Sequence, residues 1–112
     1  MADEPPVPAF DIERLRADVS AGRKQLRITT HAQVEAAKDG LLLADLRHIF
    51  ENGRVIETYP EDYRVLLYAI TPTDNLPGHI VVEDTPEAGV IITAYVPDRN
   101  QWIANVRRRS RK

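Results

Sequence analysis

Six polar side chains in this sequence could together carry out acid–base chemistry on a phosphate ester. They are two histidines, a carboxylate, an arginine and two hydroxyl-bearing residues: His31, His79, Glu57, Arg64, Thr93 and Tyr95. A base can activate a ribose 2′-hydroxyl while a second group protonates the leaving oxygen. A guanidinium group can stabilise the negative charge that develops on phosphorus. These residue types therefore suffice for metal-independent cleavage of a phosphodiester.

The spacing of these residues indicates which side chains share a face. Thr93 and Tyr95 are two residues apart in a strand-like run, so both side chains emerge on one face of a sheet. Glu57 and Tyr59 have the same relationship, and Arg64 begins the run that follows. If these runs pair, one surface holds a base, a cation and hydroxyl groups. The competing interpretation is that threonine and tyrosine stand here only as good strand formers.

The two histidines allow a functional and a purely structural interpretation. His31 follows Thr30, a good N-cap, so it lies beside a helix N-terminus whose free N–H groups can hold a phosphate. His79 opens a strand after Leu76-Pro77-Gly78 and can point into a cleft. Either imidazole could instead serve only the structure or face the solvent. His48 lies within a predicted helix, and we expect it at the surface.

Metal and cofactor chemistry find less support in the sequence. Two histidines and Glu57 could in principle bind zinc, but no two histidines lie one helical turn apart. The sequence has no Gly-rich phosphate loop and no nucleophile elbow. We therefore expect no metal and no cofactor.

Composition and charge limit the partners and the compartment. The chain has no cysteine and no apolar run long enough to cross a membrane, and its acidic, proline-rich start is unlike a signal peptide, which favours a cytoplasmic protein. Residues 24–106 hold seven Lys or Arg against twelve Asp or Glu, whereas residues 107–112 carry five positive charges in six positions. Nucleic-acid-binding surfaces are usually basic, so this balance counts against RNA binding unless the tail supplies the charge.

Hydrophobic periodicity predicts two to three helices followed by four strands. The helices are expected from Asp11 to about Gly22, from about His31 to Asp39 and from about Ala44 to Glu51, with a short extended segment at Leu26–Thr29. The strands are expected at residues 54–59, 64–71, 79–83 and 90–96. Short loops between sequential strands imply an antiparallel meander. The predicted fold is therefore α+β, with the helices packed on one face of a four-stranded antiparallel sheet.

The hydrophobic periodicity also predicts the domain organisation of the chain. Residues 1–10 hold several prolines and no periodic pattern, so we expect a disordered lead-in. Residues 11–106 are expected to form one domain, and residues 107–112 a flexible basic tail.

The order of short motifs along the chain is a further feature of the sequence. The motifs are Arg27-Ile28-Thr29-Thr30-His31-Ala32, Glu35, Gly40, Asn52-Gly53, Val55-Ile56-Glu57 with Tyr59-Pro60-Glu61-Asp62, Arg64, Leu66-Leu67, His79-Ile80-Val81-Val82, Ile91-Ile92-Thr93-Ala94-Tyr95-Val96-Pro97-Asp98 and Trp102. In this order and spacing they resemble the small bacterial DUF4258 family, over about residues 26–105.

The resemblance implies a RelE-like or barnase-like fold, a ribonuclease activity of the toxin type and a partner antitoxin that occludes the site. His31 matches the family's His-Ala motif, and His79 matches its His-Val-Val motif. The Thr-x-Tyr motif and the polar positions of the preceding strand pair are matched by Thr93, Tyr95, Glu57 and Arg64. The chain departs from the family in the helix predicted from about His31 to Asp39, which is the first helix of the family. Glu35 and Asp39 stand there in place of the arginines of many members.

Three hypotheses follow. The first is a metal-independent endoribonuclease of toxin–antitoxin type, with His31 or His79 as acid or base, Arg64 on the phosphate and the two hydroxyls orienting or donating a proton. The second is a non-catalytic protein-interaction module in which the histidines are structural. The third is an accessory protein that binds nucleic acid through its basic tail. Convergence of His31 and His79 beside Thr93 in an open cleft would favour the enzyme, and burial or separation would favour the module.

Overall fold

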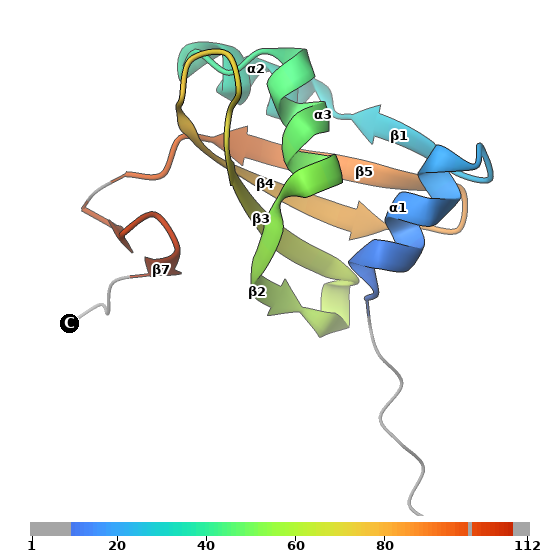
Figure 1. The fold of residues 1–112 in the computed structure, drawn as a ribbon. Helices are drawn as coiled ribbons and strands as arrows, with labels where there is room; N and C mark the ends of the chain where they lie inside the picture. The colour runs from blue at the N-terminus through green and yellow to red at the C-terminus, as the bar shows by residue number, and fades with distance from the viewer. Residues whose placement is uncertain (1–9, 99, 109–112) are drawn as a thin grey trace, which may run out of the picture.

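Three helices lie over one face of a twisted sheet in the computed structural model, which describes residues 10–98 and 100–108 (Figure 1). The helices are α1 (Ile12–Ser20), α2 (Thr30–Lys38) and α3 (Leu43–Asn52), with a 3-10 turn η1 (Pro60–Asp62) after the first long strand. The strands are β1 (Gln25–Ile28), β2 (Arg54–Tyr59), β3 (Arg64–Ile70), β4 (Pro77–Asp84), β5 (Ala88–Tyr95), β6 (Trp102–Ile103) and β7 (Arg107–Arg108).

The main sheet has five strands in the order β1-β5-β4-β3-β2. Strands β2 to β5 form the predicted antiparallel meander, and β1 adds to its far edge by pairing parallel to β5. The predicted α+β class is thus confirmed, but the prediction of a four-stranded, wholly antiparallel sheet is wrong. The short extended segment expected near Leu26 is the fifth strand, whose backbone groups are satisfied by residues 88–91.

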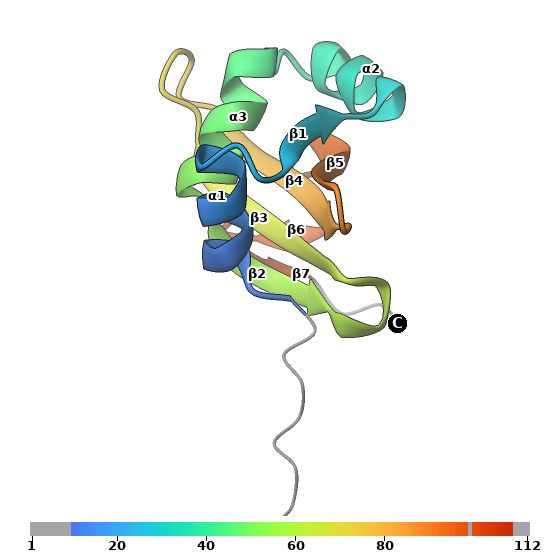
Figure 2. The same cartoon turned by 90° about the vertical axis from the view of Figure 1, so that its right-hand side faces the viewer.

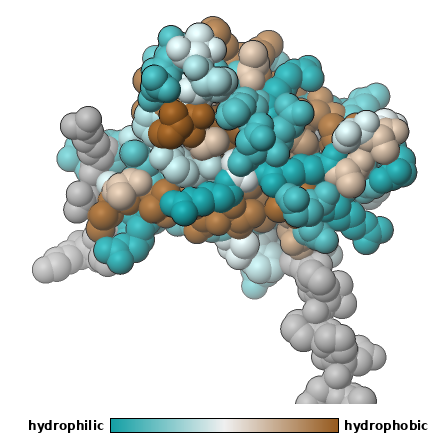
Figure 3. Space-filling view, viewed as in Figure 1, coloured by the Kyte–Doolittle hydropathy of each residue, from teal (hydrophilic) through white to brown (hydrophobic). Residues whose placement is uncertain are grey.

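The core lies between the helices and the sheet. Ile49 and Phe50 of α3 and Leu15 of α1 are buried together with side chains from the strands beneath them. Two glycines allow this close approach: a Cβ at Gly78 would lie 2.5 Å from Ile49 Cδ1, and one at Gly89 would lie 3.1 Å from Leu15 Cδ2. Figure 2 shows α1 and α3 together on one side of the sheet, and α2 at the end of the sheet near β1 and β5. The face that bears α1 and α3 mixes hydrophilic and hydrophobic residues (Figure 3).

Helix α2 begins one residue earlier than expected. Thr29, and not Thr30, is the N-cap: its Oγ1 accepts a hydrogen bond from the Ala32 amide at 3.0 Å. The same hydroxyl donates to the main-chain carbonyl of Ile92 on β5, also at 3.0 Å. One side chain therefore both starts α2 and ties it to the strand that carries Thr93.

The face of the sheet opposite the helices, here called the open face, carries most of the predicted site residues. Alternation along each strand turns Leu67, Ile80 and Ile91 to the core and their neighbours to the open face. The open-face residues of β2 to β5 are Arg54, Glu57, Tyr59, Arg64, Leu66, Tyr68, His79, Val81, Glu83, Val90, Thr93 and Tyr95. A β-bulge at Ile92 shifts the alternation along β5 by one residue, because Val81 pairs with Thr93 and Val82 pairs with Ile91. Ile91 and Ala94 therefore both face the core.

The chain returns to the open face at its C-terminal end. Trp102–Arg108, here called the C-terminal hairpin, contains β6 and β7, which pair with each other. Arg107 and Arg108 were expected in the flexible tail but form β7. Residues 1–9 of the expected lead-in and residues 109–112 of the expected tail lie outside the described residues. In the part of the chain that the structure describes, no helix has the length and apolar character needed to cross a membrane.

The double role of Thr29 can be tested by substitution. We expect Thr29→Ala to lower the free energy of unfolding by about 1–2 kcal/mol, because it removes an N-cap and a bond to β5. Thr30→Ala is the matched control, since Thr30 is exposed and caps nothing, and it should cost less than about 0.5 kcal/mol. Urea denaturation measures both values. Equal losses would contradict the assignment of the cap to Thr29.

Candidate functional site

His79 lies at the centre of an aromatic and polar cluster on the open face. It pairs with Tyr68 on β3 and with Tyr95 on β5 by strand register. Its ring meets the rings of Tyr68, Tyr95 and Trp102 edge-on, with centroids 5.8, 5.2 and 4.5 Å away. The side chain is fully buried, at 0 % exposure. His79 is therefore held rigidly between two strands and the C-terminal hairpin.

Both nitrogens of His79 have hydrogen-bond partners. Nε2 lies 2.5 Å from the main-chain carbonyl of Asn105, and Nδ1 lies 3.3 Å from the Tyr95 hydroxyl. A carbonyl can only accept, so Nε2 carries the proton and Nδ1 accepts from Tyr95. Burial lowers the pKa of His79 below its ordinary value of 6.5, against the opposing effects of the Asn105 carbonyl and the charge of Glu57. His79 is thus a neutral imidazole of one tautomer at pH 7.

Glu57 is the carboxylate of this cluster. The Tyr59 hydroxyl donates to its Oε1, and Arg108 donates from Nη2 to Oε1 at 3.2 Å and from Nε to Oε2 at 3.4 Å. Partial burial alone would raise the pKa of Glu57, but the hydrogen bonds from Arg108 and Tyr59 outweigh it and leave the pKa below its usual value. Burial and the hydrogen bond to Glu57 raise the pKa of Tyr59 to about 12. An ionised carboxylate and a neutral imidazole thus share one cluster.

Arg108 connects Glu57 to the tryptophan that covers His79. Its guanidinium carbon lies 4.5 Å from the centre of the Trp102 ring, within the range of a cation–π interaction. The Trp102 ring is 3 % exposed and stands between Arg108 and His79. The C-terminal hairpin therefore covers the His79 imidazole and binds the Glu57 carboxylate, the two groups of the cluster that could exchange a proton.

His31 occupies a different environment at the edge of the same face. It is exposed in the first turn of α2, and its Nε2 lies 3.5 Å from Thr93 Oγ1. Thr93 and Tyr95 are two apart on β5, so His31 and His79 contact successive open-face residues of one strand. The two imidazoles converge along β5, but only His31 is open to solvent.

Arg64 stands apart from these groups. Its Nε donates to Glu83 Oε1 on β4 at 2.8 Å, and both side chains are partly exposed. Strand register places Arg64 beside Tyr59, the hydrogen-bond partner of Glu57. The structure thus brings Glu57, His79 and Tyr95 into one cluster, with His31 and Thr93 beside it. Arg64 pairs instead with Glu83, next to the cluster residue Tyr59.

Three residues of the cluster are neither among the predicted site residues nor in the sequence motifs: Tyr68, Asn105 and Arg108. Tyr68 lies four residues after Arg64 in the same predicted strand and therefore shares its face, and this spacing could have revealed it. Asn105 contributes only its main-chain carbonyl, which no side-chain pattern reveals. Arg108 belongs to a basic run that resembles a solvated tail, and its partner Glu57 is 51 residues away. Of these three residues, only Tyr68 had a signal in the local sequence.

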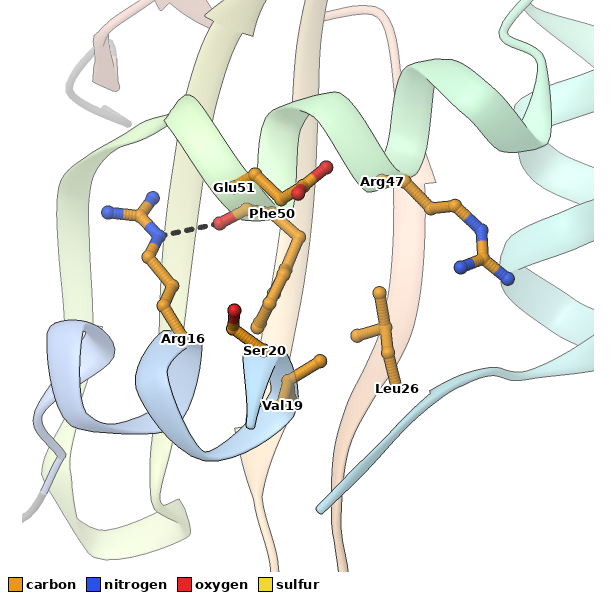
Figure 4. A pocket seen from close by; sticks show the side chains of 7 residues that line it. All are labelled: Arg16, Val19, Ser20, Leu26, Arg47, Phe50 and Glu51. Atoms are coloured by element: carbon orange, nitrogen blue, oxygen red, sulfur yellow. Dashed lines mark hydrogen bonds between the residues drawn. The ribbon is translucent and has the colours of Figure 1, made fainter. Parts of the chain in front are cut away.

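A cavity of about 300 Å³ lies on the helical side of the sheet, and it contains none of the six predicted site residues. Val19, Leu26 and Phe50 give it apolar walls, and Arg47 and Glu51 stand on α3 at its border (Figure 4). Arg16 crosses from α1 to α3, where its Nε donates to the Phe50 carbonyl at 2.7 Å. This arginine joins two helices, and the cavity is separate from the cluster on the open face.

A metal site needs several ligand side chains gathered in one place. Across residues 10–98 and 100–108, no three or more His, Asp or Glu side chains form a group that could hold a metal ion. The groups available for chemistry on the open face are therefore the imidazoles, the carboxylates, the arginines and the hydroxyls described above.

The fold and the open face define a small α+β domain whose sheet carries imidazole, carboxylate, guanidinium and hydroxyl groups on the side free of helices. The family model described as "Domain of unknown function (DUF4258)" matches residues 28–96, more than half of the chain. The protein belongs to this family, which confirms the resemblance. All six predicted site residues lie within the match, whereas α1 and the C-terminal hairpin lie outside it. No curated protein and no solved structure matches the chain significantly.

The buried state of His79 predicts a pH dependence of stability. Because its pKa is lowered in the folded protein, the unfolded chain takes up the proton first as the pH falls through about 6.5. The free energy of unfolding should therefore decrease below pH 6.5, by at most about 1.4 kcal/mol per pH unit for one proton. His79→Gln should remove this slope between pH 6.5 and 5, as measured by urea denaturation at each pH.

His48→Gln is the matched control, because His48 lies on α3 and bonds only within its helix, to Asn52. This variant should keep the slope of the unmodified protein. Glu57 and Asp18, whose pKa values are also lowered, affect stability at lower pH, since their ordinary values are 4.5 and 3.8. An unchanged slope in His79→Gln would contradict the neutral, buried imidazole.

Proposed function

We propose that this protein is a cytoplasmic, metal-independent endoribonuclease of toxin type, acting on the open face of the sheet. The observation that carries the proposal is the shared cluster of Glu57 and His79, an ionised carboxylate and an imidazole with pKa values shifted by their surroundings. Paired groups with different environments are the usual basis of acid–base assignments in enzymes. Their arrangement on a sheet face with arginines suits an anionic substrate.

Glu57 and His79 divide the proton transfers in this proposal. Glu57 accepts the proton of a ribose 2′-hydroxyl, whose oxygen then attacks phosphorus. The bond to the 5′-oxygen breaks, and protonated His79 supplies the proton to that oxygen, which leaves a 2′,3′-cyclic phosphate. Tyr95 orients the imidazole through Nδ1. His31 and Thr93 bind the adjoining part of the strand, and Arg64 stabilises charge on the phosphate.

The charge of the open face supports an RNA substrate despite the acidic composition of the domain. Arg27 projects to this face, since Leu26 and Ile28 on either side of it pack on the core, and Arg54 lies over the open-face ring of Tyr68. The acids Glu57 and Glu83 are each paired with an arginine. Positive charge therefore exceeds negative charge along the strands of this face, as phosphate binding requires.

Cleavage of mixed RNA in the presence of EDTA tests the proposal. We expect the unmodified protein to give products that end in 2′,3′-cyclic phosphate. Glu57→Gln should lower the rate by about 10²–10⁴-fold, the usual contribution of a general base. Tyr95→Phe removes one hydroxyl and should lower the rate less. His48→Gln is the control that should cleave normally.

RNA that stays intact with the unmodified protein, or a Glu57→Gln variant that cleaves at the full rate, would refute the ribonuclease. Because His79→Gln could act through stability, its activity should be compared at a temperature where thermal denaturation finds it folded. The toxin type further requires that expression arrests growth and that a partner antitoxin relieves the arrest. Arrest that persists in Glu57→Gln would argue against cleavage as its cause.

A non-catalytic protein-interaction module is the second candidate. It is favoured by the full burial of His79, whose two nitrogens are both engaged within the protein. In that case His79→Gln should lower the free energy of unfolding by about 1 kcal/mol or more, and no variant should alter RNA. The third hypothesis, nucleic-acid binding by the basic tail, concerns residues 107–112, of which the structure describes Arg107 and Arg108.

A further inference from the structure

We propose that the C-terminal hairpin is an autoinhibitory lid, which closes the Glu57–His79 cluster in the free protein and is displaced by a single-stranded polyanion. The inference rests on the proposed ribonuclease function and concerns the regulation of the same site.

The hairpin engages each group that the proposed chemistry needs. The Asn105 carbonyl accepts the Nε2 proton of His79, so this nitrogen has no proton to give to a substrate oxygen. Arg108 binds both carboxylate oxygens of Glu57, which occupies the base. The Trp102 ring covers the imidazole edge-on at 4.5 Å between centroids. A nucleotide can therefore reach neither group while the hairpin is closed.

The attachment of the hairpin is separate from the main core. Within the described residues, β6 and β7 pair with each other and with no strand of the main sheet. None of the hairpin residues belongs to the cluster of buried side chains between the helices and the sheet. Its turn also holds Ala104 and Asn105 at φ values of 52° and 65°, a left-handed conformation that is unfavourable for alanine. Opening the hairpin therefore leaves the core between the helices and the sheet intact.

Phosphate groups are well suited to release the lid. The Arg108–Glu57 pair is partly exposed, at 45 % and 23 % for the two side chains, so it is weak and screened by salt. A phosphate can bind the same guanidinium with two parallel hydrogen bonds. Arg107 and Arg108 lie at the start of a run of five positive charges, which attracts a polyanion to the hairpin itself. A phosphate of the substrate backbone would then bind Arg108 in place of Glu57 and leave the Glu57 carboxylate free.

Opening also changes the proton affinity of His79. Burial is the main reason that its pKa is low, whereas the Asn105 carbonyl and the charge of Glu57 favour the imidazolium and the charge of Arg108 opposes it. The rings of Tyr68, Tyr95 and Trp102 complete the surroundings of the imidazole. Removing the hairpin takes away the Asn105 carbonyl as well as the cover and the opposing cation. Because burial is the largest of these effects, the pKa of His79 rises, and the imidazole becomes able to hold the proton that the leaving oxygen needs.

Trp102 is the only tryptophan of the chain, so its fluorescence reports the position of the lid. The probe is a single-stranded DNA oligonucleotide, which carries phosphates but has no 2′-hydroxyl and is not cleaved by the proposed mechanism. Adding it to the full-length protein should shift the emission to longer wavelength and increase quenching by acrylamide, because Trp102 passes from 3 % exposed to solvent-exposed. Inorganic phosphate at equal ionic strength is the control for salt.

Arg108→Ala and Arg107→Ala form a matched pair, since both remove one exposed charge but only Arg108 contacts Glu57. Arg108→Ala should give the shifted emission without DNA and cleave a dinucleotide, which carries one phosphate, about fivefold faster than the unmodified protein. Arg107→Ala should behave as the unmodified protein in both measurements. Thermal denaturation checks that each variant is folded.

The two measurements separate the lid from the ribonuclease. Emission that stays unchanged with DNA and in Arg108→Ala, while RNA is cleaved, would overturn the lid and leave the ribonuclease in place. Emission that shifts while all RNA stays intact would overturn the ribonuclease, and with it the inhibitory role of the hairpin. A shift together with faster dinucleotide cleavage by Arg108→Ala alone supports both.

Discussion

The backbone pairing of β5 with two neighbours is the interaction on which the rest of the structure depends. On one side β5 pairs antiparallel with β4, which carries His79, and on the other it pairs parallel with β1, which leads into α2 and His31. Its core side holds Ile91 and Ala94 against the helices. Its open side holds Thr93 and Tyr95, each in contact with one of the histidines. Without this strand, neither imidazole would have a fixed position.

The burial of His79 links stability to chemistry at the same residue. A buried polar side chain is tolerated when all its polar atoms have partners, and Tyr95 and Asn105 supply those partners here. The arrangement that satisfies His79 also withdraws it from solvent. An enzyme using this imidazole must therefore exchange internal hydrogen bonds for bonds to a substrate. An interaction module would need no such exchange, which is the physical difference between the two candidate functions.

Local features of the fold could be predicted from the sequence, because local spacing determines them. Alternation placed Thr93 with Tyr95 on one face, and helical periodicity located α3 to within a residue at each end. The parallel partner of β1 was not predicted, since four residues of extended chain carry no information about a strand sixty residues later. The cap at Thr29 was missed for a related reason: its hydroxyl is fixed partly by Ile92, a distant residue.

The candidate site was predicted in its residue types more than in its geometry. Glu57, His79 and Tyr95 belong to one cluster, but the groups that define their state, Arg108 and the Asn105 carbonyl, come from a segment that resembled a solvated tail. Basic runs usually remain in solvent, so composition favoured the wrong environment for Arg108. The contact between Arg108 and Glu57 joins residues 51 positions apart and exists only in the folded protein, so a single sequence does not reveal it.

The parallel pairing of β1 also affects how the protein is made. Thr29 is held by Ile92, 63 residues further along the chain, so the edge strand and the start of α2 lack their β5 partner until those 63 residues have been synthesised. Contacts between segments so distant slow folding, because a long loop must close before they form. On the ribosome, the surface that joins His31 to Thr93 can assemble only after β5 has been synthesised.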